Sequence, residues 1–216
     1  MKILAFNGSP RKKWNTAMLL EHALKGAEYE GAETELFHLY DLDYKGCISC
    51  FACKRIGGAS YGHCAQKDDL TPVFKKIEAA DAILIGSPIY YAITTGETRS
   101  FLERLMFQYS VYDPQRSTLF GRKIRTGFIY TAGARERMVK EMGFDRNTQA
   151  TEMAMARIFG SCESFFVTDT CQFDDYSNYF STLFNPEEKK KRRDEQFPGD
   201  CRRAYEMGAR LVRRES

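Results

Sequence analysis

The distribution of apolar and polar residues alternates between strand-like and helix-like segments. Residues Lys2–Asn7 form a short apolar run that ends at Gly8, and from Asn15 onward apolar residues recur with the spacing of a helix. Further strand-like runs are Thr34–Leu39, Ala82–Ile85, Lys123–Thr131 and Ser164–Thr168. Helical periodicity fills the intervals, around residues 69–80, 101–106 and 135–159. This alternation predicts an α/β fold in which a parallel sheet carries helices on both faces.

Loops at the carboxyl ends of the strands are the expected location of a ligand in such a sheet. The loops after the first, third and fourth strands are therefore the candidates for a functional site. The segment after the fifth strand, residues 171–216, is expected to be a helical extension of the same domain. One helix starts at Asn185, because Pro186 and Glu188 are typical of a first turn, and a closing helix follows. We therefore expect residues 1–216 to form a single domain.

The composition argues against several classes of function. Hydrophobic residues make up 43% of the chain, and 32 basic against 29 acidic residues leave a net charge of +3, too close to neutrality to favour nucleic-acid binding. The basic run Lys189–Arg193 is flanked by acidic residues and is interpreted as a solvated helix face. Nothing resembles a signal peptide or a membrane span of about 20 residues, so we expect a cytoplasmic protein. The 7 cysteines then indicate thiols or ligands, not disulfides.

The first loop (Gly8–Thr16), between the first strand and the first helix, has the composition of an anion site. Ser9, Asn15 and Thr16 offer hydroxyl and amide donors, and Arg11 adds a positive charge. The amides at the start of the helix, with the positive end of its dipole, complete such a site. The loop matches neither the P-loop nor the dinucleotide fingerprint. An ordinary capped loop between strand and helix is the alternative.

The second loop (Gly86–Gly96) follows the third strand and contains Ser87-Pro88-Ile89-Tyr90-Tyr91. Together, the two loops resemble the flavodoxin-like NAD(P)H-dependent FMN reductase family over about residues 1–133. In that family the first loop holds the FMN phosphate, and a Ser-Pro-(Ile or Val)-Tyr segment lines the isoalloxazine ring. The resemblance implies a flavodoxin-like five-stranded parallel sheet with strand order 2-1-3-4-5.

The resemblance also assigns FMN contacts by position. The phosphate contacts would be Ser9, Arg11, Asn15 and Thr16. The ring contacts would be Pro88, Ile89, Tyr90 and Tyr91, with Thr131 and Gly133 on the flavin's other side. Many relatives have Gly or Asn after the aromatic pair, where this chain has Ala92 and Ile93, so we expect altered contacts near the redox-active edge. Hydride transfer to flavin needs no protein acid or base, and no catalytic side chain is assigned.

Four cysteines lie in the cysteine loop, residues 44–67. Cys47, Cys50 and Cys53 are each separated by two residues, a spacing that bacterial ferredoxins use for iron–sulfur ligation. Cys64 is the candidate fourth ligand. In the iron–sulfur flavoprotein branch of the family the fourth cysteine follows more closely, whereas residues 54–63 intervene here, although closure of a longer loop costs little more. Three interpretations are open: a [4Fe–4S] cluster on these thiols, a zinc site with His63 as a candidate ligand, or a metal-free loop of reduced cysteines.

These expectations combine into an FMN-binding oxidoreductase. The expected electron donor is NADH or NADPH, and the acceptor a quinone, another small molecule, or a redox protein partner reached through a cluster. The alternative is an FMN electron carrier or redox sensor that does not turn over a nicotinamide. The aromatic-rich stretches Phe107–Phe120 and Phe173–Phe184 are expected to cover the flavin or to form an interface. We expect a homodimer or a dimer of dimers, with no nucleic-acid or membrane partner.

Overall fold

The computed structural model describes residues 1–213, in which strands and helices alternate. The strands are β1 (Lys2–Asn7), β2 (Glu33–His38), β3 (Ala82–Tyr90), β4 (Ile93–Thr94), β5 (Ile124–Thr131) and β6 (Gly160–Val167). The helices are α1 (Asn15–Tyr29), α2 (Leu70–Ala79), α3 (Gly96–Tyr109), α4 (Glu136–Glu141), α5 (Phe144–Phe159), α6 (Pro186–Glu195) and α7 (Phe197–Val212). Short 3₁₀ helices are η1 (Leu39–Asp41), η2 (Ala52–Lys54) and η3 (Tyr176–Asn178).

The parallel strands of the sheet are ordered β2-β1-β3-β5-β6. Because β4 pairs antiparallel with the end of β3, the parallel strands alone follow the order 2-1-3-4-5, which confirms the predicted fold. Strand β1 lies between β2 and β3, with Ile3 aligned to Thr34 on one side and to Ala82 on the other. The chain therefore changes direction across the sheet next to β1, and a crevice at the carboxyl edge follows from this topology.

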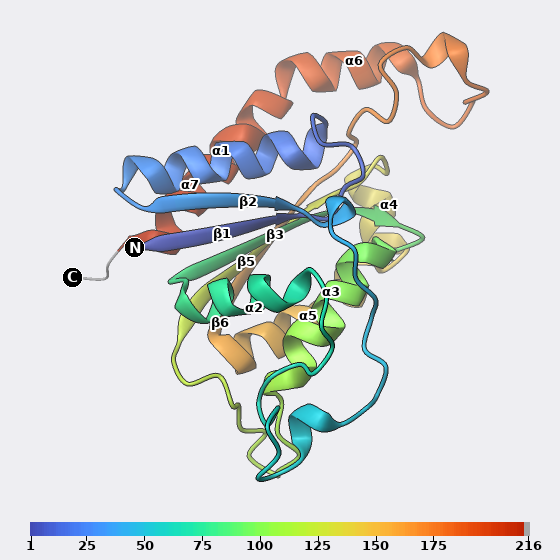
Figure 1. Cartoon of the computed structure of the whole chain (residues 1–216). Coiled ribbons are helices and arrows are strands. Elements are labelled where there is room, and N and C mark those ends of the chain that lie inside the picture. The colour runs from blue at the N-terminus through green and yellow to red at the C-terminus, as the bar shows by residue number, and fades with distance from the viewer. Residues whose placement is uncertain (214–216) are drawn as a thin grey trace.

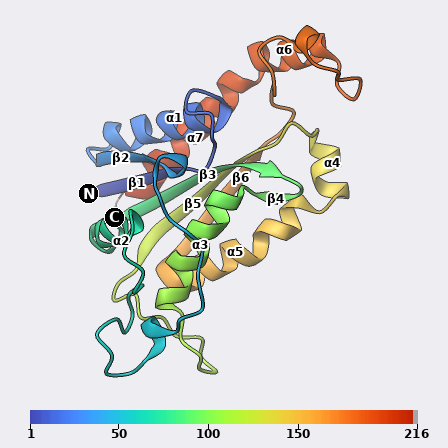
Figure 2. The ribbon, with the colours of Figure 1, turned by 45° about the vertical axis from the view of Figure 1, so that its right-hand side comes forward.

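Each face of the sheet carries its own core, because successive side chains of a strand point to opposite faces. Leu4 and Phe6 of β1 pack with residues of α2, α3 and α5. Ile3 and Ala5 pack on the opposite face with residues of α1 and α7. Figures 1 and 2 show these two helical layers on either side of the sheet.

The last helix, α7, is part of the core. It packs along α1 so closely that a Cβ on Gly26 would lie 1.9 Å from the carbonyl oxygen of Tyr205. A Cβ on Gly208 would lie 1.8 Å from the carbonyl oxygen of Ala23. The C-terminal extension therefore supplies one of the two helices that cover this face, and α6 projects beyond it (Figure 1).

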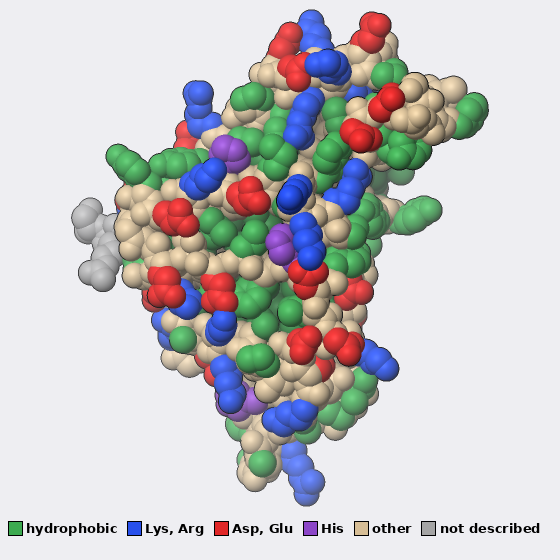
Figure 3. All heavy atoms as spheres, turned by 45° about the horizontal axis from the view of Figure 1, so that its top comes forward, with side chains coloured by type: hydrophobic (Ala, Val, Ile, Leu, Met, Phe, Trp, Pro, Cys, Tyr) green, Lys and Arg blue, Asp and Glu red, His purple; other side chains and the backbone are tan. Residues whose placement is uncertain are grey.

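The cysteine loop lies beside the C-terminal end of α3, away from the carboxyl edge of the sheet (Figures 1 and 2). Apart from η2 it is irregular, as the sequence predicted. Figure 3 shows basic and acidic side chains interspersed over one face of the molecule, in keeping with the net charge of +3. Over residues 1–213, no helix has the length and apolar character needed to cross a membrane.

Candidate functional site

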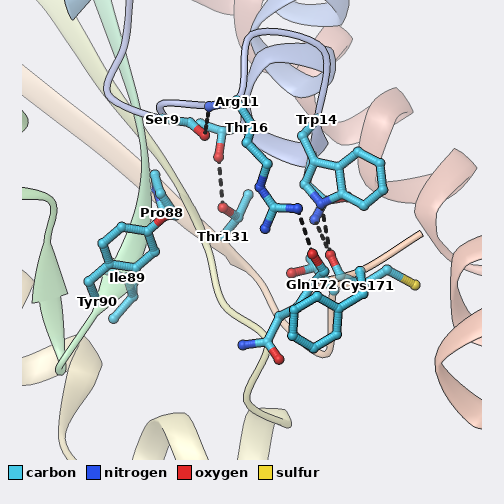
Figure 4. A pocket seen from close by; sticks show the side chains of 14 residues that line it. Ser9, Arg11, Trp14, Thr16, Pro88, Ile89, Tyr90, Thr131, Cys171 and Gln172 are labelled. Carbon is cyan, nitrogen blue, oxygen red and sulfur yellow. Dashed lines mark hydrogen bonds between the residues drawn. The ribbon is translucent and has the colours of Figure 1, made fainter. Parts of the chain in front are cut away.

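A cavity of about 200 Å³ opens at the carboxyl edge of the sheet, between the loops that follow β1, β3, β5 and β6. Figure 4 shows Ser9 and Arg11 on one side of the cavity and Pro88 and Tyr90 on the other. The lining residues are Ser9, Arg11, Trp14, Asn15, Thr16, Pro88, Ile89, Tyr90, Thr131, Gly133, Thr170, Cys171, Gln172 and Phe173.

The first loop presents polar groups at the start of α1. The Ser9 amide donates to Asn7 Oδ1 at 3.0 Å, and Ser9 Oγ accepts from the Arg11 amide at 3.2 Å. Trp14 is the N-cap of α1, and its side chain makes no cap hydrogen bond within the described chain. The first-turn amides are thus left for another acceptor, at the positive end of the helix dipole. This arrangement favours an anion site over the capped loop of the alternative interpretation.

A buried polar network joins the first loop to the second. The Gly8 amide donates to the Gly86 carbonyl at 2.8 Å, and Thr95 Oγ1 donates to the Gly8 carbonyl at 2.8 Å. Thr98 Oγ1 donates in turn to Ser87 Oγ at 3.3 Å. Because these groups are buried and mutually satisfied, the two loops hold a fixed spacing.

The second loop builds the apolar wall of the cavity from Pro88, Ile89 and Tyr90. The next residues, Tyr91 and Ala92, form the turn between β3 and β4 with φ of 49° and 68°. Both values lie in the left-handed region, which costs roughly 1–2 kcal/mol per non-glycine residue and which hairpin turns usually assign to Asn or Gly. Tyr91 lies outside the cavity and is fully exposed.

The cavity floor comes from β5. The hydroxyls of Thr131 and Thr16 are 2.8 Å apart and buried, which connects β5 to the start of α1. Gly133 follows at the strand exit and also lines the cavity. The structure therefore brings the assigned FMN residues together around one cavity, with Tyr91 as the exception.

In the segment after β6, the sequence singled out only the aromatic stretch that begins at Phe173, which lines the cavity, and gave no role to the two residues before it. These residues, Cys171 and Gln172, also line the cavity, and their carbonyl groups accept hydrogen bonds from the first loop. The Cys171 carbonyl accepts from Trp14 Nε1 at 3.0 Å and Asn15 Nδ2 at 2.8 Å, and the Gln172 carbonyl accepts from Arg11 (Figure 4). Ligands in such sheets lie at the carboxyl ends of the strands, and β6 is one of these strands. This rule was the available sequence-based reason to include the segment after β6 in the candidate site.

The interpretation of Lys189–Arg193 as a solvated helix face is wrong for Lys189 and Arg192, which are buried, whereas Lys190 and Lys191 are exposed. Lys189 is 2% exposed, and its Nζ donates to the Gly133 carbonyl at 2.6 Å and to Asp169 Oδ1 at 2.5 Å. Arg192 is also buried and pairs with Asp200. Arg193 donates to Asn15 Oδ1, so Asn15 has protein partners at both ends of its amide. Helix α6 thus ties together the loops around the cavity.

A second, smaller cavity is lined by Cys47, Cys50, Cys53 and Cys64. Cys53 is buried and Cys50 is exposed, while the other two are half-buried. Burial raises the pKa of the Cys53 thiol, the Lys54 ammonium opposes that rise, and the three other thiols add to it. Within the described chain, no three His, Cys, Asp or Glu side chains converge closely enough to hold a single metal ion.

The long connection between Cys53 and Cys64 closes on itself. The Gly62 amide donates to the Cys53 carbonyl at 3.0 Å, so residues 54–61 form a loop whose ends meet. Lys54 Nζ donates to carbonyl groups at the end of α3, including that of Gln108 at 3.3 Å. The Cys64 amide donates to Gln108 Oε1 at 2.9 Å. These contacts place Cys64 beside the other thiols despite its distance in sequence.

Comparison with known proteins identifies a family and several similar curated proteins. The family model described as NADPH-dependent FMN reductase matches residues 1–142. An iron-sulfur flavoprotein of Archaeoglobus fulgidus is 42% identical over 104 residues, which is 48% of each chain. One of Methanocaldococcus jannaschii is 36% identical over 104 residues, 48% of this chain and 51% of that protein. The chain thus spans about half the length of these curated relatives.

Solved structures with a similar fold have low sequence identity to this chain. An NAD(P)H:quinone oxidoreductase from Methanothermobacter marburgensis has a TM-score of 0.71 at 16% identity, covering 100% of this chain and 99% of that one. An FMN-dependent NADH-azoreductase from Bacillus anthracis has a TM-score of 0.66 at 11% identity, covering 99% and 100%. At such identities these likenesses establish the fold alone.

Proposed function

Because the chain belongs to the NADPH-dependent FMN reductase family, we propose that it binds FMN in the cavity at the carboxyl edge of the sheet and oxidises a reduced nicotinamide. The observation that carries this proposal is the convergence of the first and second loops on one cavity. The polar end fits a phosphate, since Ser9 and Thr16 are buried there beside the uncapped start of α1. The apolar end, formed by Pro88, Ile89 and Tyr90, fits a planar ring.

The protein's part in this chemistry is binding and orientation. When bound, FMN would supply a carrier that takes up a hydride from NADH or NADPH and releases electrons in pairs or singly. The buried network of Thr95, Thr98 and Ser87 fixes the phosphate side relative to the ring side. With FMN bound, the Pro88–Tyr90 wall would exclude water from that side of the cavity. Hydride transfer to flavin requires no acid or base from the side chains, and we therefore assign no catalytic residue.

For the cysteine loop we propose a [4Fe–4S] cluster held by Cys47, Cys50, Cys53 and Cys64. Thiolates are the ligands that such clusters use, and all four line one cavity. Gln108 lines the same cavity, and its Nε2 is buried with no hydrogen-bond partner among residues 1–213. An unsatisfied buried donor is costly, and the sulfur of a cluster would provide the missing acceptor. The relatives named iron-sulfur flavoproteins support the same assignment.

The possible electron acceptors depend on the FMN cavity and the cysteine cavity. We propose that electrons leave FMN for a small molecule such as a quinone, or pass through the cluster to a redox protein partner. Helix α3 connects the sites, because it begins at the second loop and carries Arg104, Phe107 and Gln108 against the cysteines. About 12–18 Å separates the start of α3 from these residues along its axis, at 1.5 Å per residue.

Mixing the purified protein with NADH or NADPH under anaerobic conditions tests the proposed activity. We expect the protein to be yellow, and the visible absorbance of its oxidised flavin to fall within a stopped-flow trace with at least one of the two nucleotides. Absence of bleaching with both would assign the protein to the carrier or sensor class. A protein that is colourless and fails to bind added FMN would contradict the cofactor itself.

We also propose that a second copy of the chain covers some of the exposed aromatic side chains. Tyr91, Tyr112 and Phe180 have exposed fractions of 104%, 76% and 98%, and large exposed aromatic side chains are typical of interfaces. Sedimentation velocity at micromolar protein is expected to show a dimer or a dimer of dimers. A single monomeric species over that range would contradict the proposal.

A further inference from the structure

Helix α3 supplies the inner wall of the cysteine cavity. Arg104 and Gln108 occupy positions i and i+4 of the helix, so their side chains lie one above the other on the same helix face. Both side chains are buried, with residue exposures of 1% and 2%. Buried polar side chains need hydrogen-bond partners. The partners of Arg104 and Gln108 therefore indicate which groups this cavity can hold.

Arg104 has a fixed orientation. Its terminal nitrogens bond Asp68, with Nη2 donating to Asp68 Oδ1 at 3.0 Å, and Nη1 also donates to the Lys45 carbonyl at 3.2 Å. The remaining group, Nε–H, donates to Cys64 Sγ at 3.3 Å. The ion pair with Asp68 therefore aims the guanidinium so that one donor faces a cysteine sulfur.

Only one of the two polar atoms of the Gln108 side-chain amide has a hydrogen-bond partner among residues 1–213. Its Oε1 accepts from the Cys64 amide at 2.9 Å, which decides the orientation of the amide group. Its Nε2 is then a buried donor without a partner in the described chain, in a cavity lined by four thiols. The acceptor that this cavity offers is sulfur.

We propose that Arg104 and Gln108 are positioning residues that donate hydrogen bonds to sulfur atoms of the cluster, an inference that rests on the cluster assigned above. Arg104 holds Cys64 in the fourth ligand position, which the long Cys53–Cys64 connection alone does not specify. Hydrogen bonds to ligand sulfur stabilise the more negative, reduced cluster. The two donors therefore raise the reduction potential of the cluster.

Two variants of Arg104 separate the hydrogen bond from the charge. In Arg104→Gln, Nε2 occupies the place of the arginine Nε and keeps a donor toward Cys64. In Arg104→Met, a methyl group occupies that place and the donor is lost. Both variants lose the positive charge and the ion pair with Asp68, so their difference reports the donor alone.

The experiment is anaerobic purification followed by iron and sulfide assays and a redox titration monitored by EPR. We expect the cluster of Arg104→Met to have a more negative potential than that of Arg104→Gln, or to be lost while Arg104→Gln keeps it. Gln108→Glu, which retains an acceptor for the Cys64 amide, is expected to lower the potential or the iron content as well. FMN content and thermal unfolding establish that each variant is folded.

Three outcomes would overturn the inference. Equal potentials in wild type and all three variants would remove it while leaving the proposed cluster in place. Equal cluster loss in both Arg104 variants would assign the effect to the Asp68 ion pair instead. Wild-type protein free of iron and sulfide after anaerobic purification would overturn the proposed cluster, and the inference with it.

Discussion

Gly8→Ala is expected to weaken FMN binding by roughly 10- to 100-fold. A Cβ at Gly8 would lie 1.9 Å from Thr98 Oγ1 and 3.1 Å from the Gly86 carbonyl oxygen. Both atoms belong to the network that joins the first and second loops, so the variant relieves the clash by separating them. FMN binding then has to restore their spacing. Overpacking a buried site costs about 1–3 kcal/mol, and about 1.4 kcal/mol corresponds to a tenfold change in Kd.

Titration of the FMN-free protein with FMN, followed by flavin fluorescence, measures this effect. Gly121→Ala is the matched control, because a Cβ at Gly121 meets no atom within 4 Å. It reports the general effect of removing a glycine and is expected to leave FMN affinity unchanged. Thermal unfolding of both FMN-free variants shows whether the fold is retained. Wild-type affinity in Gly8→Ala would mean that the spacing of the two loops does not control the cofactor site.

The sheet could be predicted from the sequence because its strands are short apolar runs between clear breaks. Residues Lys2–Asn7 were predicted as a strand and form β1 with the same bounds. The end of β3 was placed at Ile85, whereas the strand continues to Tyr90. Pairing explains the difference, because Ser87 and Pro88 align with Tyr130 and Thr131 of β5. From the sequence alone, a proline indicates the end of a strand. Only the pairing with the neighbouring strand shows that β3 continues past Pro88.

The candidate FMN site could be predicted where its side chains lie in short, recognisable loop motifs. Ser9, Thr16, Pro88 and Tyr90 lie in two recognisable loops, and the structure places them around one cavity. The segment at Cys171–Phe173 lines the same cavity through carbonyl groups and a ring, and carbonyl groups leave no signature in a sequence. Tyr91 shares its motif with Tyr90, but the turn directs the chain away after Tyr90.

Long-range partners account for the basic run. Lys189 lies among charged neighbours, and this local pattern is typical of a solvated helix. Its partners, Gly133 and Asp169, are separated from it by 56 and 20 residues. A buried lysine needs such partners to offset the cost of leaving water, and helical periodicity does not identify them. For the same reason, the sequence left the position of Cys64 open, whereas the contacts of Gln108 and Arg104 define it.

Cys53→Ser is expected to remove the cluster and leave FMN in place. Cys53 is the buried member of the four thiols, and its replacement leaves three ligands in a cavity that holds no other cysteine. We expect iron to fall from about four atoms per chain to near zero, as one thiolate is lost from a four-thiolate site. The flavin absorbance should persist, because Cys53 does not line the FMN cavity. Iron and sulfide assays on anaerobically purified protein measure the change.

Cys162→Ser is the control for this substitution. Cys162 lies on β6 away from the cysteine cavity, and burial raises its pKa to about 11, so its thiol stays protonated at neutral pH. Its replacement is expected to leave iron, sulfide and FMN at wild-type levels. If Cys53→Ser kept wild-type iron, the metal would have to be bound elsewhere. If Cys53→Ser and wild type both lacked iron, the loop would be the metal-free form, and electrons from FMN would go directly to a small acceptor.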